Sequence, residues 1–217
     1  MRPVIFDLDG TLIDSAPDIR AAVNRMLEGE GHDPLDLPTV ISFIGNGLPR
    51  LVARAMAARA IPDSEHARLT AITKAHYDAA PAVLTRPYPG VPDMLATLNA
   101  RGYLLGLCTN KPEDSARALL DDMGLAHHFD AIIGGDRLPV PKPDPAMLHA
   151  CVAELGHAGS AVLVGDSEVD AATAHAAGVP FLLFTRGYRK SPPEALNPAA
   201  TFDDHATLPA LVAALPV

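Results

Sequence analysis

The chain has 217 residues, of which 48% are hydrophobic and 20% charged, and its formal net charge is −9. This composition is typical of a globular protein with one large domain or two small ones. The acidic balance argues against a nucleic acid partner, which would require a basic face. Because no apolar run approaches the roughly 18 residues of a membrane span and the N-terminus lacks a signal-peptide core, we expect a cytoplasmic protein with no membrane partner.

The first predicted element is a buried strand at Val4–Phe6, which runs into Asp7 and Asp9 and must turn at Gly10. In an extended chain, side chains two residues apart point to the same side, so both carboxylates would face one pocket. Two adjacent carboxylates repel each other unless a cation or a proton lies between them. The alternative is an ordinary Asp-Gly turn whose side chains cap nearby backbone amides.

From residue 15 to about residue 83, apolar residues recur at helical spacing and no strand is predicted. The segment Asp14-Ser15-Ala16-Pro17 is typical of a helix start, with Ser15 or Asp14 as the cap and a proline in the first turn. This part of the chain therefore predicts a small bundle of helices.

From residue 85 onward, predicted helices alternate with continuous apolar strands, and each helix is followed by a glycine. Such alternation is typical of a parallel sheet that is covered by helices on both faces. The predicted fold class is α/β: a Rossmann-like parallel sheet of at least five strands, formed by residues 1–14 and 85–217, with residues 15–84 as a helical insertion. The helices are expected at 91–100, 113–123, 145–155 and 168–177, and the strands at 103–108, 131–134, 161–164 and 181–184.

Polar side chains follow the predicted strands, where ligands bind in open parallel sheets. They are Thr109, Asn110 and Lys111 after the second strand, Lys142 between two prolines after the third, and Asp166 and Asp170 after the fourth. Each has an ordinary alternative, such as a helix cap, a surface lysine or an acid that stabilises a helix dipole. Because all of them fall at one sheet edge with Asp7 and Asp9, they predict a hard-cation site, suited to Mg²⁺, beside an anion site.

In order and spacing, these motifs resemble those of the haloacid dehalogenase-like hydrolase superfamily over essentially the whole chain. The matching stretches are Asp7-Leu8-Asp9-Gly10-Thr11-Leu12, Thr109-Asn110, Lys142-Pro143, and Gly165-Asp166 with Asp170. The resemblance implies that the helical insertion is a cap domain, and that the chain hydrolyses a small phosphate ester.

The resemblance also implies roles for these residues. Asp7 would be the nucleophile that forms an aspartyl-phosphate, and Asp9 would protonate the leaving oxygen and then activate water. Thr109 and Lys142 would hold the phosphoryl oxygens. Mg²⁺ would be bound by the Asp7 side chain, the Asp9 carbonyl and Asp166, with Asp170 close or acting through water. A carboxylate at Asp9 favours a phosphatase, because the dehalogenating branch lacks one there.

Residues 44–52 of the insertion have two glycines around Asn46. Together with Asp14-Ser15-Ala16-Pro17 and Thr109-Asn110-Lys111-Pro112, they resemble the bacterial phosphoglycolate phosphatase branch of that superfamily. The resemblance implies 2-phosphoglycolate as substrate and adds Gly45, Asn46 and Arg50 to Thr109, Asn110 and Lys142 as substrate-binding residues. A plain turn between helices with a surface arginine is the alternative for this stretch.

Two other functions stay open. One is a sugar-phosphate phosphatase or phosphomutase of the same superfamily. The other is a receiver-like signalling module that keeps a phosphoryl group on an aspartate, since receiver domains also gather acids, a threonine and a lysine at one sheet edge. Whichever function applies, we expect the protein to be a monomer or a homodimer.

Overall fold

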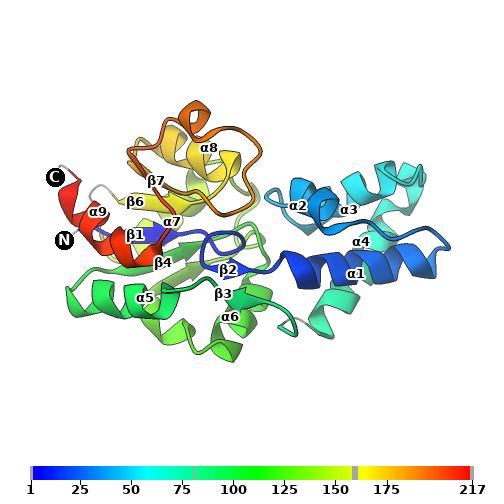
Figure 1. Cartoon of the computed structure of the whole chain (residues 1–217), viewed down its shortest axis with the longest axis horizontal. Helices are drawn as coiled ribbons and strands as arrows, with labels where there is room; N and C mark the ends of the chain where they lie inside the picture. Colours follow the sequence, from blue (N-terminus) through cyan, green and yellow to red (C-terminus); the bar gives the residue numbers. More distant parts are fainter. Residues whose placement is uncertain (1, 81, 158–160, 216–217) are drawn as a thin grey trace.

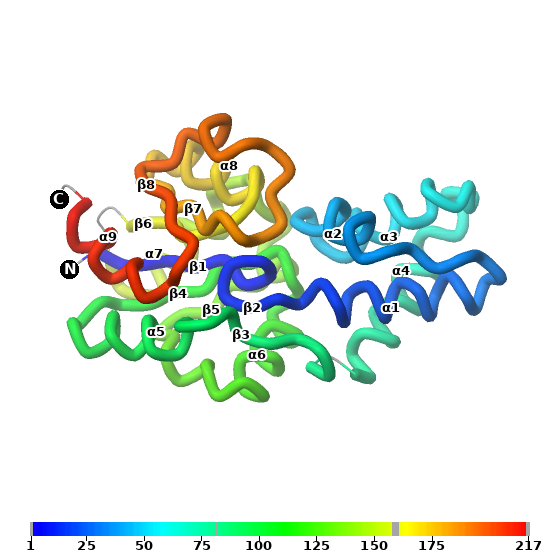
Figure 2. The backbone as a smooth tube through the Cα atoms, in the orientation of Figure 1, coloured from blue at the N-terminus to red at the C-terminus, as the bar shows by residue number. Residues whose placement is uncertain are grey.

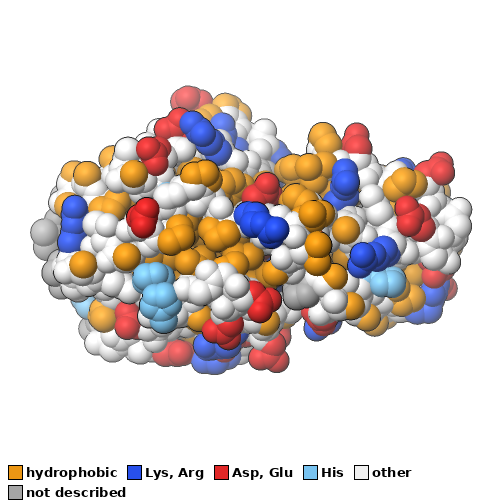
Figure 3. Space-filling view, turned by 60° about the horizontal axis from the view of Figure 1, so that its bottom comes forward, with side chains coloured by type: hydrophobic (Ala, Val, Ile, Leu, Met, Phe, Trp, Pro, Cys, Tyr) orange, Lys and Arg blue, Asp and Glu red, His pale blue; other side chains and the backbone are white. Residues whose placement is uncertain are grey.

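The computed structural model describes residues 2–80, 82–157 and 161–215. It has an α/β lobe and a smaller helical lobe, and the chain passes between them at β2 (Ile13–Asp14) and β3 (Arg86–Pro87) (Figure 1; Figure 2). The molecule narrows where the two lobes meet (Figure 3). None of the helices in the described part of the chain is long and apolar enough to cross a membrane.

The centre of the α/β lobe is a sheet that has six parallel strands within the described residues. Their order is β5-β4-β1-β6-β7-β8. The central strand β1 pairs with β4 through Val4 and Leu105 and with β6 through Val4 and Val162. The bounds are β1 Val4–Phe6, β4 Leu105–Cys108, β5 Ala131–Ile133, β6 Val162–Gly165, β7 Phe181–Phe184 and β8 Ala200–Phe202.

Alternate residues of each strand point to opposite faces of the sheet, and both faces are buried. In β1, Val4 and Phe6 join the core under α5, α6 and α9, while Ile5 joins the core under α7 and α8. The helices are α5 Val91–Ala100, α6 Glu113–Asp122, α7 Ala146–Glu154, α8 Glu168–Ala177 and α9 Leu208–Ala214, with short 3₁₀ turns η2 Ala126–His128, η3 Pro193–Leu196 and η4 His205–Thr207.

The helical lobe is made of four helices within the described residues, and its apolar side chains form one core that continues into that of the α/β lobe. The helices are α1 Ala16–Gly29, α2 Leu37–Phe43, α3 Leu48–Ala57 and α4 His66–Asp78, the last preceded by the 3₁₀ turn η1 Asp63–Glu65. The two linkers between the lobes form a short antiparallel pair, β2 Ile13–Asp14 with β3 Arg86–Pro87.

The α/β class, the parallel sheet of at least five strands and the inserted helices are confirmed. Helices 91–100 and 168–177 have the expected bounds. The sequence pattern missed β8, α9 and the β2–β3 pair, because these elements are only two to seven residues long. The domain boundaries at residues 14 and 85 and the oligomeric state stay predictions.

Candidate active site

Asp7 lies at the carboxyl end of the central strand and is buried, with 8% of its surface exposed. Its Oδ1 accepts a hydrogen bond of 2.9 Å from the ammonium of Lys142, a lysine that is 3% exposed. The same ammonium donates to Oδ1 of Asp170 at 2.7 Å. One buried cation thus joins the end of β1 to the first turn of α8. These three residues therefore meet at one edge of the sheet, as the sequence predicts.

Asp7, Asp166 and Asp170 form a group of buried acids in which one oxygen of each lies within 4.8 Å of the others. Burial, followed by repulsion from Asp170, raises the pKa of Asp7 from 3.8 to about 7, against the lowering effect of Lys142. Burial and the charges of Asp170 and Asp7 also raise the pKa of Asp166. Three acids beside one lysine leave an excess of negative charge, and such an oxygen-rich set suits a hard divalent cation.

The loops around Asp166 hold its carboxylate from two sides. Its Oδ1 accepts a 2.8 Å hydrogen bond from the Thr11 hydroxyl, and its Oδ2 accepts one of 2.5 Å from the Tyr188 backbone N–H. A β-carbon on Gly10, where φ is +90°, would lie 2.5 Å from this Oδ2. The turn after β1 therefore requires glycine both for its backbone conformation and for its approach to Asp166.

Asp170 uses its second oxygen within its own helix start. Its Oδ2 accepts hydrogen bonds from the backbone N–H and the hydroxyl of Ser167, forming a capping box with that residue. This leaves Oδ1 as the oxygen that accepts the hydrogen bond from Lys142.

Asp9 has different neighbours, although it is only two residues from Asp7. Both of its carboxylate oxygens lie 3.1 Å from the ammonium of Lys111, and Oδ1 also accepts a 2.5 Å hydrogen bond from the Ser15 hydroxyl. Ser15 was one of the two expected caps of α1, but its side chain makes no capping hydrogen bond. Instead the Tyr188 hydroxyl accepts from the backbone N–H groups of Ser15 and Ala16 at 2.9 and 3.0 Å.

Asn110 links three segments. Its Nδ2 donates to the carbonyls of Gly45 and Lys142, both at 3.0 Å, and its Oδ1 accepts from the Lys142 N–H at 2.9 Å. Thr109, which is 1% exposed, directly follows β4 and lines the cleft described next. Asn110 thus orients the Lys142 loop and ties it to the helical lobe.

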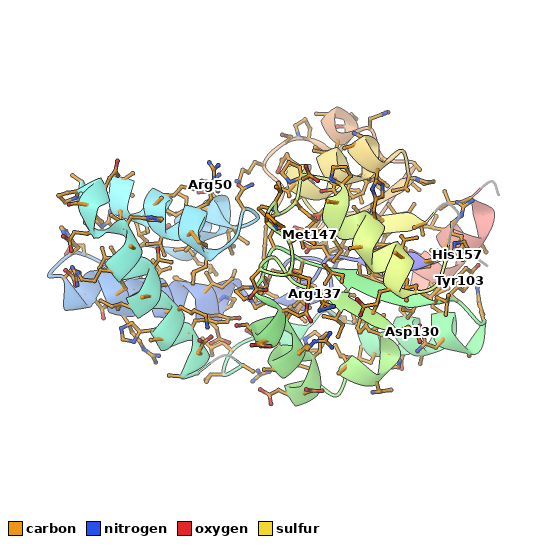
Figure 4. All side chains as sticks on the ribbon, turned by 180° about the vertical axis from the view of Figure 1, so that it is seen from behind. Arg50, Tyr103, Asp130, Arg137, Met147 and His157 are labelled. Atoms are coloured by element: carbon orange, nitrogen blue, oxygen red, sulfur yellow. The ribbon has the colours of Figure 1, made fainter. Side chains whose placement is uncertain are left out.

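A cleft of about 720 Å³, which includes solvent at its mouth, lies between the lobes. Asp7, Asp9 and Thr109 line it on one side, with Gly45 and Tyr77 on the other. Among the described residues that line it, Lys142, Asn46 and Arg50, which the sequence predicts as substrate-binding residues, do not occur. Asn46 accepts a hydrogen bond from Arg54. Arg50 is exposed on the helical lobe (Figure 4).

The sequence placed Lys111 at the same sheet edge but gave it no role, and it did not assign Ser15 and Tyr188 to the site. A role for Lys111 could have been expected, because it is two residues beyond Thr109 at a strand end and so falls on the same side of the chain. Ser15 and Tyr188 carry no local signal, since their partners lie in distant segments.

The fold and this site are those of an α/β enzyme: an acid lies beside a lysine, a second acid is held by another lysine, and three buried acids cluster at the same sheet edge. The family model of haloacid dehalogenase-like hydrolases matches residues 4–184. The chain belongs to this family of hydrolases.

Relatives in this family match almost the full chain. A phosphoglycolate phosphatase of Cereibacter sphaeroides is 51% identical over 214 residues, which cover 98% of each chain, and one of Rhodospirillum rubrum is 45% identical, covering 95% of this chain and 89% of the other. The crystal structure of a predicted phosphoglycolate phosphatase from Haemophilus somnus is 30% identical, with a TM-score of 0.92 over 98% of each chain.

Proposed function

We propose that the protein hydrolyses 2-phosphoglycolate to glycolate and phosphate. Two kinds of observation support this proposal. The site combines a candidate nucleophile, Asp7, with a separately held acid, Asp9, at the floor of one cleft. The similarity to phosphoglycolate phosphatases extends over nearly the whole chain, including the helical lobe that covers this cleft.

In the proposed reaction, a carboxylate oxygen of Asp7 attacks phosphorus and the bond from phosphorus to the glycolate oxygen breaks. Asp9 gives its proton to that leaving oxygen. Asp9, now ionised, takes a proton from water, and the water oxygen attacks phosphorus to release phosphate and free Asp7. Lys142 stabilises the negative charge that gathers on the phosphoryl oxygens, and the Thr109 hydroxyl donates to one of them.

The residues present fit a magnesium ion, because Asp7, Asp166 and Asp170 bring three buried carboxylates together and, within the described part of the chain, Lys142 is the one cation paired with them. Asp7 and Asp166 would hold the ion, with the Asp9 carbonyl as a further ligand. Asp170 would lie close or act through water. When bound, magnesium offsets negative charge on the phosphoryl group.

The observation that carries the proposal is the contrast between Asp7 and Asp9. Asp7 lies in the acidic cluster with Lys142, whereas Asp9 is held by Lys111 and Ser15 outside that cluster. A receiver-like module keeps its phosphoryl group, and a second acid that is placed to activate water would remove it. This arrangement therefore favours turnover over storage.

The test is phosphate release from 2-phosphoglycolate and from a panel of sugar phosphates, each measured with Mg²⁺ and with a chelator. We expect a strong preference for 2-phosphoglycolate that the chelator abolishes. Activity spread over the sugar phosphates would agree with hydrolysis of phosphate esters but would overturn 2-phosphoglycolate as the substrate. Transfer of the phosphoryl group within a sugar phosphate, with no phosphate released, would favour the phosphomutase. A stable phosphoprotein without turnover would favour the receiver-like module.

A further inference from the structure

Lys111 is a buried cation at the boundary between the two lobes. Its side chain is 6% exposed, and its ammonium lies 3.1 Å from both oxygens of Asp9. The ammonium also faces the ring of Tyr77, a residue of α4, at 4.6 Å from the ring centre. Burial opposes the charged form, but Asp9 and Tyr77 more than offset it and the pKa of Lys111 is raised. Lys111 is therefore a permanent cation in the cleft.

The cleft has few positive charges that could receive a substrate anion. Among the described residues that line it, only Lys74 and Lys111 carry a cationic side chain. Lys74 is half exposed, and Asp78 pairs with it at 2.5 Å. Lys111 lies deeper, beside the acid that is proposed to protonate the leaving oxygen, and water screens it less than Lys74.

The position of Lys111 matches the second charge of the proposed substrate. Asp9 must contact the ester oxygen, and in 2-phosphoglycolate one methylene separates that oxygen from the carboxylate carbon. A group 3.1 Å from the Asp9 oxygens is within reach of that carboxylate. The ammonium donates to both oxygens of Asp9 and its third hydrogen faces Tyr77, so a substrate carboxylate would take the place of Tyr77 as the acceptor of that hydrogen.

Tyr77 adds a second feature to this corner of the cleft. Its side chain is buried and lines the cleft, and its hydroxyl makes no hydrogen bond of normal geometry within the described part of the chain. A buried hydroxyl without such a partner is costly unless a ligand or water completes it. The ammonium and this hydroxyl together offer two donors from opposite lobes.

We propose that Lys111, with the Tyr77 hydroxyl beside it, binds the carboxylate of the substrate and so selects phosphate esters of short 2-hydroxy carboxylic acids. This inference rests on the proposed function and names the residue that determines its specificity. A phosphate ester without the carboxylate would bind without this contact. Because Tyr77 belongs to the helical lobe, the selection requires both lobes.

The test compares two substrates, 2-phosphoglycolate and 2-hydroxyethyl phosphate, in which a hydroxymethyl group replaces the carboxylate. In Lys111→Met, we expect kcat/KM to fall roughly 10- to 100-fold further for 2-phosphoglycolate than for 2-hydroxyethyl phosphate, as the loss of a hydrogen bond between charged groups predicts. Most of this difference should appear in KM. Lys111→Arg should restore part of the preference.

Lys74→Met is the matched control, since it removes the other cation of the cleft, and it should leave the ratio of the two kcat/KM values unchanged within about threefold. If Lys111→Met does not fold, Lys111→Gln takes its place as the variant that removes the cation. An equal fall for both substrates would mean that Lys111 only positions Asp9, and would overturn the inference. Wild-type protein without any preference for the carboxylated ester would instead overturn the proposed function.

Discussion

The side-chain amide of Asn110 donates a hydrogen bond of 3.0 Å to the carbonyl of Gly45, which lies 65 residues earlier in the chain. Gly45 belongs to the turn between α2 and α3, whereas Asn110 follows β4. The same amide holds the backbone of Lys142 through two further hydrogen bonds. One side chain therefore joins the helical lobe to the loop that carries the proposed phosphoryl-binding lysine.

We expect Asn110→Ala to loosen the helical lobe and to raise KM about tenfold, because the variant loses both the link to Gly45 and the support of Lys142. Small-angle scattering would show a larger radius of gyration. Asn24→Ala is the control, since Asn24 also makes two hydrogen bonds with backbone groups, both with Leu35 inside the helical lobe. Equal radii for wild type and Asn110→Ala would contradict the proposed link.

We expect Lys142→Met to cost about 3–5 kcal/mol of stability in chelator, because it leaves Asp7 and Asp170 buried without their cation. Its kcat should fall by about 10²- to 10³-fold. Denaturant unfolding and steady-state kinetics measure the two effects. In Lys74→Met the lost pair with Asp78 is exposed and should cost at most about 1 kcal/mol. Similar losses in the two variants would rule out the proposed role of Lys142 in balancing the cluster.

Much of the fold follows from local pattern. The helices at 91–100 and 168–177 agree with their predicted bounds because a glycine follows close behind each and an apolar strand comes next. The edge strand Ala200–Phe202 has three residues and only one buried side chain, so it has too little pattern to be recognised. The pair formed by Ile13–Asp14 and Arg86–Pro87 exists only because the insertion returns beside its own start.

Some residues of the site could likewise be predicted from the sequence, and others could not. Asp7, Lys142, Asp166 and Asp170 could be placed together because parallel strands bring their carboxyl ends to one edge. The role of Ser15 could not be predicted from its position at a helix start. The Tyr188 hydroxyl, 173 residues away, accepts from the Ser15 backbone N–H, and the serine hydroxyl donates to Asp9 instead of capping the helix.

Magnesium should stabilise the protein more as the pH rises. In the metal-free protein the pKa of Asp7 is raised from 3.8 to about 7, so the folded state binds a proton that the unfolded state has lost. The stability that comes from this group therefore falls as the pH rises from about 4 to 7. Magnesium competes with that proton, and its effect on Tm should be larger at about pH 8 than at about pH 5. An equal gain in Tm from magnesium at the two pH values would contradict the assignment of Asp7 as a ligand.

Gly187→Ala should weaken magnesium binding by about tenfold or more. A β-carbon at this position would lie 2.3 Å from both the Cβ and the Oδ2 of Asp166, so the carboxylate would have to move. Isothermal titration with Mg²⁺ measures the effect without substrate. Gly29→Ala is the control, because no atom lies within 4 Å of its added carbon. Unchanged affinity in Gly187→Ala would remove Asp166 from the proposed ligand set.

The central claim is that Asp7 takes up the phosphoryl group and Asp9 is needed to release it. The most direct test mixes Asp9→Asn with Mg²⁺ and acetyl phosphate, whose leaving carboxylate needs no proton from Asp9, and locates any added mass by intact-protein and peptide mass spectrometry. We expect one phosphoryl group on Asp7, and none when Asp7→Asn is combined with this variant. A phosphoryl group on another residue, or wild-type turnover in Asp7→Asn, would contradict the claim.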